Sequence, residues 1–178
     1  QNQFGQLGNG STADSASPVA VTMPVGVTFS AVNVGVYTTC ALSTIGKAYC
    51  WGANGVGQIG DGTTTNHSIP KAITIPAGIS FTAISTNNTY TCALTSTGTV
   101  YCWGSGSTTA SVSTPAAITM PTGVTFTEIT TGYAHACGLT SAGKAYCWGA
   151  NDSGQLGNGT TTTSAIPASV TMPTGVSF

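Results

Sequence analysis

Hydrophobic and polar residues alternate along this chain in short stretches, which are separated by glycine, proline and asparagine. Alternation with a period of two is typical of β-strands, and no stretch keeps the 3.6-residue period of a helix for three turns. In the middle of the chain the pattern predicts four strands, around Ala83–Ser85, Tyr90–Thr95, Thr99–Trp103 and Ala116–Thr119. The sequence therefore predicts an all-β protein.

Internal repeats account for most of the chain. A segment that begins with a cysteine and ends with Cys-Trp-Gly occurs three times, at Cys40–Gly52, Cys92–Gly104 and Cys137–Gly149. A second marker, Met/Ile-Pro-x-Gly-Val/Ile-x-Phe, ends at Phe29, Phe81, Phe126 and Phe178, so successive copies are 52, 45 and 52 residues apart.

A third marker, Gly-Gln-Leu/Ile-Gly-Asn/Asp-Gly, occurs at 5–10, 57–62 and 154–159, and it is missing after Trp103. The loss of seven residues at this point accounts for the shorter spacing of 45. Because the loop can be shortened without disturbing the flanking markers, we expect it to lie on the surface.

Units of about 40–50 residues with four strands each are typical of β-propeller blades. We expect three full blades and a partial one: residues 1–29 form the loop and outer strand of a partial blade, and blades follow at 30–81, 82–126 (with the shortened loop) and 127–178. Propellers need at least four blades to close a ring. The chain also opens on Gln1-Asn2-Gln3 without Met or an apolar leader. We therefore expect it to be a stretch of a larger protein of tandem blades.

The six cysteines form three pairs that are each ten residues apart: Cys40/Cys50, Cys92/Cys102 and Cys137/Cys147. If the middle hairpin turns around Ser96-Thr97-Gly98, Leu94 faces Val100 and the two cysteines face each other. Opposed residues of an antiparallel pair lie close enough for a disulfide. Structural disulfides are the favoured interpretation, ahead of reduced core thiols and of a metal site, and they indicate an oxidising compartment.

A tryptophan follows the second cysteine of every pair, and a tyrosine precedes that cysteine. Alternation along a strand sends the aromatic side chains to the face opposite the cysteines. We expect them to form a layer that packs blade on blade, and a ligand-stacking role is the alternative. The residues concerned are Trp51, Trp103, Trp148, Tyr49, Tyr101 and Tyr146.

The run from Tyr133 to Thr160, Tyr-Ala-His-Ala-Cys-Gly-Leu-Thr-Ser-Ala-Gly-Lys-Ala-Tyr-Cys-Trp-Gly-Ala-Asn-Asp-Ser-Gly-Gln-Leu-Gly-Asn-Gly-Thr, resembles a repeat of the regulator of chromosome condensation family in its Cys-containing bacterial form. The resemblance covers almost the whole chain. It implies a β-propeller fold, usually of seven blades, and it implies no particular chemistry, because function lies in loops carried by the fold.

Charged residues make up 4% of the chain, with three Lys, no Arg and a net charge of -1. An average soluble domain has about 25%. Nucleic-acid partners are therefore not expected, because they require a basic surface. Membrane insertion is not expected either, because no run approaches the ~18 apolar residues that a bilayer requires.

Catalytic, cofactor and metal sites are not expected from the residues present. Gly55–Gly60 matches the dinucleotide pattern G-x-G-x-x-G, but Asp61-Gly-Thr-Thr-Thr follows and cannot open a helix. His67 and His135 are the only histidines, and four carboxylates do not readily assemble an acid–base pair. Five Asn-x-Ser/Thr sequons could carry sugars in a secreted protein, at Asn9, Asn66, Asn87, Asn151 and Asn158.

These observations favour a non-enzymatic extracellular or cell-surface module of tandem repeats, part of a larger surface protein or of a self-associating assembly. Its expected partners are flanking blades, other copies of itself or another extracellular protein. The alternative is a secreted propeller that binds or inhibits another protein through its blade loops. The lack of Arg counts against that alternative. A third class, nucleotide exchange on a small GTPase with chromatin binding, fits the few basic residues and the expected disulfides least.

Overall fold

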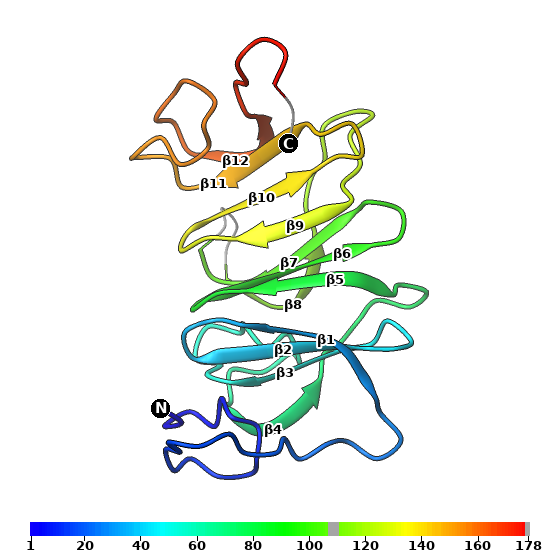
Figure 1. Cartoon of the computed structure of the whole chain (residues 1–178), viewed down its shortest axis with the longest axis vertical. Helices are drawn as coiled ribbons and strands as arrows, with labels where there is room; N and C mark the ends of the chain where they lie inside the picture. Colours follow the sequence, from blue (N-terminus) through cyan, green and yellow to red (C-terminus); the bar gives the residue numbers. More distant parts are fainter. Residues whose placement is uncertain (107–110, 177–178) are drawn as a thin grey trace.

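The computed structural model describes residues 1–106 and 111–176, and in these ranges it contains twelve strands and no helix. The strands form three separate four-stranded antiparallel sheets, which are stacked along the long axis of the molecule (Figure 1). Each sheet is a meander in which strands that follow one another in sequence are also neighbours. The described part of the chain therefore contains three propeller-type blades.

The twelve strands have closely matching lengths in the three blades. The first blade contains β1 (Phe29–Val34), β2 (Thr38–Ser43), β3 (Ala48–Gly52) and β4 (His67–Ala72). The second contains β5 (Phe81–Thr86), β6 (Tyr90–Thr95), β7 (Val100–Gly104) and β8 (Val112–Ala117). The third contains β9 (Glu128–Thr131), β10 (His135–Leu139), β11 (Ala145–Gly149) and β12 (Ser164–Ser169).

The fourth strand of the middle blade differs from the prediction. It was expected at Ala116–Thr119, and it begins four residues earlier, at Val112. Pro115 lies inside the observed strand. The strand tolerates this proline because β8 is an edge strand that pairs only with β7, and the register shifts between Cys102 and Gly104. The other three strands of this blade overlap their predicted ranges.

The central hairpin of each blade has the predicted register. Leu94 pairs with Val100 and Cys92 with Cys102, and Gly98 takes the left-handed conformation that closes the turn, with φ of 79°. The structure joins all six cysteines in three disulfides, Cys40–Cys50, Cys92–Cys102 and Cys137–Cys147, with Cα–Cα distances of 4.0–4.1 Å. Each disulfide therefore cross-links the two strands of one hairpin, at the equivalent position of the repeat.

The hydrophobic core lies between the sheets rather than within one of them. The first strands of neighbouring blades pack together, β1 against β5 and β5 against β9, and the core clusters combine residues of successive blades. The described part of the chain has no helix of the length and apolarity that crossing a membrane requires.

Candidate interaction face

The joint between the first two blades shows how one blade binds the next. The first blade contributes a cysteine-bearing face with Cys40, Leu42 and Cys50, and the second contributes an aromatic face with Phe81 and Trp103. All five side chains are at least 97% buried. The indole of Trp103 also stacks on the ring of Phe81, with centroids 6.2 Å apart. Each blade thus has two unlike faces that fit each other.

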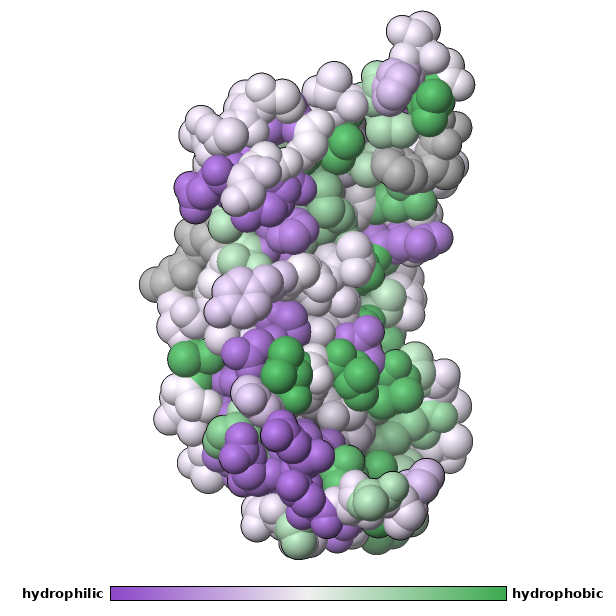
Figure 2. All heavy atoms as spheres, turned by 60° about the vertical axis from the view of Figure 1, so that its left-hand side comes forward, coloured by the Kyte–Doolittle hydropathy of each residue, from purple (hydrophilic) through white to green (hydrophobic). Residues whose placement is uncertain are grey.

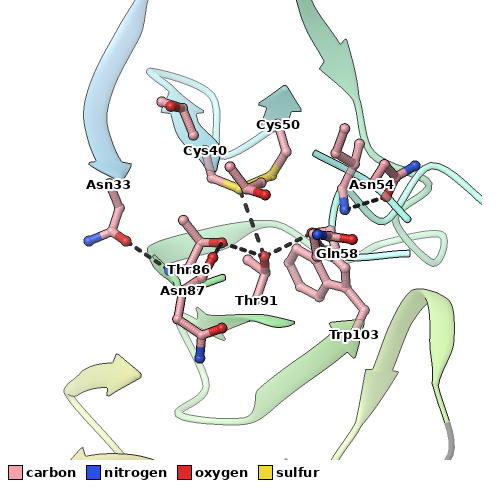
Figure 3. Close-up of a disulfide and its surroundings, with 12 residues drawn as sticks. Asn33, Cys40, Cys50, Asn54, Gln58, Thr86, Asn87, Thr91 and Trp103 are labelled. Atoms are coloured by element: carbon pink, nitrogen blue, oxygen red, sulfur yellow. Dashed lines mark hydrogen bonds between the residues drawn. A yellow bond between two sulfur atoms is a disulfide. The ribbon is translucent and has the colours of Figure 1, made fainter. Parts of the chain in front are cut away.

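The loop at residues 57–62 covers this joint from the side. The main-chain oxygen of Gln58 accepts hydrogen bonds from the indole N–H of Trp103 at 3.0 Å and from the hydroxyl of Thr91 at 2.8 Å (Figure 3). Ile59 follows and is fully buried in the core of the joint. The loop therefore follows a strand of the first blade in the sequence, but its hydrogen bonds are made to the second blade.

A buried asparagine organises this loop from inside. The side chain of Asn54 is fully buried, accepts from the N–H of Ile59 at 2.9 Å and donates to the carbonyls of Thr63 and Thr65. Asn2 and Asn151 are also fully buried and make the corresponding bonds in the other two copies of the loop. This role was not predicted from the sequence, although an asparagine at the same place in every copy of the loop was the available signal.

One copy of the loop carries a charge. Asp61 accepts hydrogen bonds from Thr63, and its second oxygen lies 2.9 Å from Nε2 of His67. Burial opposes ionisation of this carboxyl, but the bonds from Thr63 and then His67 outweigh it, so the pKa of Asp61 is lowered. Asn9 and Asn158 take the same position in the other copies.

We expect Asp61→Asn to remove part of the acid sensitivity of the protein. A lowered pKa means that the carboxylate stabilises the fold above about pH 4 and that this contribution is lost as pH falls further. Asn158 accepts the bonds from Thr160 in the same geometry, so the variant should match the native chain at pH 7. Urea midpoints at pH 7 and pH 3 measure the difference. An equal loss of stability in both chains at pH 3 would contradict this role of Asp61.

The second joint has the same faces, but the sequence after Trp103 lacks the Gly-Gln-Leu/Ile-Gly-Asn/Asp-Gly marker that forms the loop of the first joint. Cys92, Leu94 and Cys102 face Phe126 and Trp148, as in the first joint. Within residues 1–106 and 111–176, the buried indole N–H of Trp148 finds no hydrogen-bond acceptor. Ala136 also stands where the other two blades have a threonine that donates to the loop carbonyl. The blade that follows the missing marker thus also lacks one of the two side chains that donate to the loop carbonyl in the other blades.

We expect Trp103→Phe to cost about 1 kcal/mol more than Trp148→Phe. Both changes remove a similar volume from a buried indole, but only the first breaks a described hydrogen bond, to the oxygen of Gln58. Chemical denaturation of the two variants beside the native chain measures the difference. An equal loss of free energy of unfolding in the two variants would show that the hydrogen bond to Gln58 makes no net contribution to stability.

The cysteine-bearing face of the third blade is open. A hollow of about 390 Å³ lies over it, lined mainly by side chains at the positions that fill the first joint. These are Cys137, Leu139, Ala145, Cys147, Leu156 and Val170, the counterparts of Cys40, Leu42, Ala48, Cys50, Ile59 and Ile73. The face is the top surface of the stack, at the end opposite β4 (Figure 1). It is the candidate interaction face of the molecule.

The aromatic face of the first blade is half covered. Residues 1–10 lie over Trp51, whose indole N–H donates to the carbonyl of Gln6 at 3.0 Å. Val32 is 65% exposed, whereas its counterpart Ile84 in the filled joint is 8% exposed. Figure 2 shows hydrophobic residues at the surface at the height of this first sheet. The first blade therefore exposes part of the surface that receives a preceding blade.

The structure also places the remaining residues that the sequence singled out. Tyr49, Tyr101 and Tyr146 lie next to the phenylalanines that stack on the tryptophans, at centroid distances of 5.5–5.9 Å. From the sequence these phenylalanines were identified only as the ends of the second marker. Among the sequons, Asn66 is exposed, Asn9, Asn87 and Asn158 are half-buried, and Asn151 is buried in its loop.

His135 begins β10 and is half-buried. In the described part of the chain, no three His, Cys, Asp or Glu side chains lie together as a metal site.

Two family models, both described as Regulator of chromosome condensation (RCC1) repeat, match the chain. One matches residues 1–42, 46–94 and 142–178, and the other matches 29–58, 81–108 and 126–155. Ultraviolet-B receptor UVR8 of Arabidopsis thaliana is 30% identical over 103 residues, which are 58% of this chain and 23% of the receptor. The human E3 ubiquitin-protein ligase HERC2 is 31% identical over 108 residues, which are 60% of this chain and 2% of the ligase.

Solved structures show the same fold. Human WBSCR16 superimposes with a TM-score of 0.81 at 20% identity, over 96% of this chain and 46% of that one. Yeast RCC1 (Prp20), in its complex with Kap60, superimposes with a TM-score of 0.74 at 18% identity, over 98% of this chain and 44% of that one. The chain thus spans less than half of each of these four proteins.

Proposed function

Because the chain belongs to the regulator of chromosome condensation (RCC1) repeat family, we propose that it is a non-enzymatic structural and binding module of tandem blades. The observation that carries the proposal is the open hollow on the third blade, whose lining repeats a face that is filled one blade earlier. A protein face of this composition binds another protein surface through apolar burial.

We assign the module to an extracellular or cell-surface protein. Three disulfides, one in each blade, support this assignment, because such bonds persist in oxidising compartments. The test is to count free thiols in material isolated from its source under alkylating conditions. The assignment is supported if none of the six cysteines is alkylated because all are disulfide-bonded. Six alkylated thiols in folded material would contradict it.

The partner of the open face is a blade, supplied either by a larger surface protein or by a second copy. The fit of unlike faces in the two filled joints supports this choice. A denaturing gel of the native material separates the two sources. A mass well above 17.6 kDa indicates flanking blades in the same chain, and a mass of 17.6 kDa leaves self-association.

A second candidate is binding of an unrelated protein through the blade loops. Tyr133 is 80% exposed and Val36 is 63% exposed, at equivalent positions of the turns before β10 and β2. Support also comes from yeast Prp20p, whose structure was described with its binding properties to Gsp1p and histones. A pull-down with the native chain and with Tyr133→Ala tests this candidate. A tight partner that is lost on substitution would place it ahead of blade docking.

A further inference from the structure

The five Asn-x-Ser/Thr sequons differ in how the structure uses the side-chain amide of the asparagine. This sequence is the acceptor for N-linked glycans in secreted proteins. An N-linked sugar replaces one of the two hydrogens on Nδ2 and leaves Oδ1 as a hydrogen-bond acceptor. An asparagine that donates both hydrogens inside the protein therefore cannot carry a sugar in the folded chain without losing a hydrogen bond.

Two of the five asparagines use both amide hydrogens. Asn151 is fully buried, and its Nδ2 donates to two carbonyls of its own loop, at 2.9 and 3.1 Å. Nδ2 of Asn87 donates across the second joint to the carbonyls of Gly132 and Tyr133. A sugar would break one of these bonds at either position, and at Asn151 it would also open the buried centre of the loop. These two sequons are therefore closed in the folded chain.

The other three asparagines show the opposite arrangement. Each Oδ1 accepts a main-chain N–H, and Nδ2 donates no hydrogen bond within the described part of the chain. The accepted bonds run from Ser11 to Asn9 at 3.1 Å, from Asn54 to Asn66 at 2.8 Å and from Thr160 to Asn158 at 3.1 Å. Asn66 is exposed, and Asn9 and Asn158 are half-buried. These side chains are held by the oxygen, and their nitrogen is open to modification.

The open sequons occur once in each glycine loop, by which we mean the loops with the marker at 5–10, 57–62 and 154–159. Asn9 and Asn158 take the fifth position of their markers. The middle loop has Asp61 at that position, which cannot accept an N-linked sugar, and its open sequon lies five residues later, at Asn66. The sequon that is absent at Asp61 is thus replaced by another in the same loop.

The accessibility of these sites does not depend on what precedes or follows the chain. The loop at 5–10 already covers Trp51, and the loop at 57–62 already covers Trp103, so each lies against a following blade. Asn9 and Asn66 are open in this arrangement. A further blade placed against the third glycine loop in the same way would therefore leave Asn158 as open as Asn9.

The scarcity of charge gives the chain a physical use for attached sugars. Charged residues make up 4% of it, and the net charge is -1. A net charge near zero favours association and precipitation. N-linked sugars are bulky, solubilising surface groups. Sugars on the glycine loops would supply hydration that the few charged side chains do not.

We propose that Asn9, Asn66 and Asn158 carry N-linked glycans in the mature protein and that Asn87 and Asn151 do not. The sugar comes from a donor linked to a lipid through a diphosphate. The bond from the anomeric carbon to the phosphate oxygen breaks, and a bond from that carbon to Nδ2 forms. The diphosphate leaves with the bonding electron pair, and one Nδ2 proton passes to a base of the transferase. The inference rests on the extracellular assignment made under the proposed function.

Mapping of the sugars on native material tests the proposal. Folded protein from its source is treated with peptide N-glycosidase in heavy-oxygen water, which turns each asparagine that carried a sugar into a labelled aspartate. A sample without the enzyme corrects for spontaneous loss of the amide at Asn9 and Asn158, which both precede glycine. We expect enzyme-dependent label at these two residues and at Asn66. Its absence from any of the three, or its presence at Asn87 or Asn151, overturns the proposal.

Three variants test the sites one at a time in the full chain secreted by eukaryotic cells. Each introduces a residue that another copy of the repeat has at the same position. Asn9→Asp and Asn158→Asp introduce the residue found at Asp61, and Ser68→Ala introduces the residue found at Ala165. Intact mass should show three glycans on the native sequence, two on each single variant and none on the triple variant. A single variant that keeps three glycans overturns the assignment of its site.

Thr89→Ala is the matched control. It removes the sequon of Asn87 and introduces the residue that Ala134 has at the equivalent position of the third blade. The secreted chain should still carry three glycans, because Asn87 uses both amide hydrogens. A loss of one glycan would mean that Asn87 is modified and that the division by amide hydrogens is wrong.

Failure of this inference is distinguishable from failure of the proposed function. Native protein whose six cysteines are all disulfide-bonded, but which carries no sugar, overturns the glycan sites and leaves the extracellular assignment standing. Six alkylated thiols in folded material contradict that assignment itself. Because sugars add to the mass, the denaturing gel that separates flanking blades from self-association is run on enzyme-treated material.

Discussion

Removing the disulfide of the middle blade should lower the free energy of unfolding by at least about 3 kcal/mol. The Cys92–Cys102 bridge closes a loop with a sequence separation of ten, and both cysteines lie in the second joint. Cys92→Ala/Cys102→Ala loses the restriction that the bridge places on the unfolded chain, and it also loses buried sulfur packing. The denaturant midpoint of the double variant, compared with the native chain, gives the effect.

The end blade supplies the control for this prediction. Cys137→Ala/Cys147→Ala removes a bridge of equal loop length, but Cys137 is half-buried and faces the open hollow. It should therefore lose the chain-entropy contribution and little of the packing contribution. A middle-blade variant that is no less stable than the end-blade variant would show that the second joint does not depend on its sulfur atoms.

Gly60→Ala should break the first joint and cost more than 3 kcal/mol. A Cβ at this position would lie 2.5 Å from the indole nitrogen of Trp103, a rigid ring that is 1% exposed. Either the loop or the ring must move, and both the bond to Gln58 and the burial of Ile59 depend on their present positions. Tryptophan fluorescence during urea unfolding and limited proteolysis of the loop provide the measurements.

Gly62→Ala is the matched control in the same loop. Its φ of 88° is close to the 85° of Gly60, so both variants carry the left-handed strain of about 1–2 kcal/mol. A Cβ at Gly62 meets only Cγ2 of Thr114, at the ordinary contact distance of 3.8 Å. The difference between the two variants therefore measures the contact with Trp103. Equal costs would mean that backbone strain alone accounts for the effect of Gly60→Ala.

The hairpins could be predicted from the sequence because their information is local. Cysteines ten residues apart around a glycine turn define which residues face each other, and the register of Cys92 with Cys102 follows. The outer strand was harder to predict, because the pairing that makes Val112 part of β8 spans the shifted register opposite Gly104. A proline in an edge strand reads as a break unless the partner strand is known.

The interaction face could be predicted only in part. The cysteines and tryptophans were recognised as repeated positions, but periodicity does not say which blade a face meets. The decisive residues lie far apart in sequence, as when Gln58 bonds to Trp103 across 45 positions. The buried amide of Asn54 was not predicted, because its hydrogen bonds appear only once the loop is closed around it.

The local placement of the disulfides also bears on how the chain reaches its fold. Six cysteines can pair in 15 ways. Every native pair lies within one hairpin, so the correct partner is also the nearest in sequence and forms the smallest loop to close. Each blade can therefore be oxidised as soon as its hairpin has formed, before any joint exists. Oxidative folding of this chain needs no ordered sequence of bond rearrangements, however many blades are joined in a row.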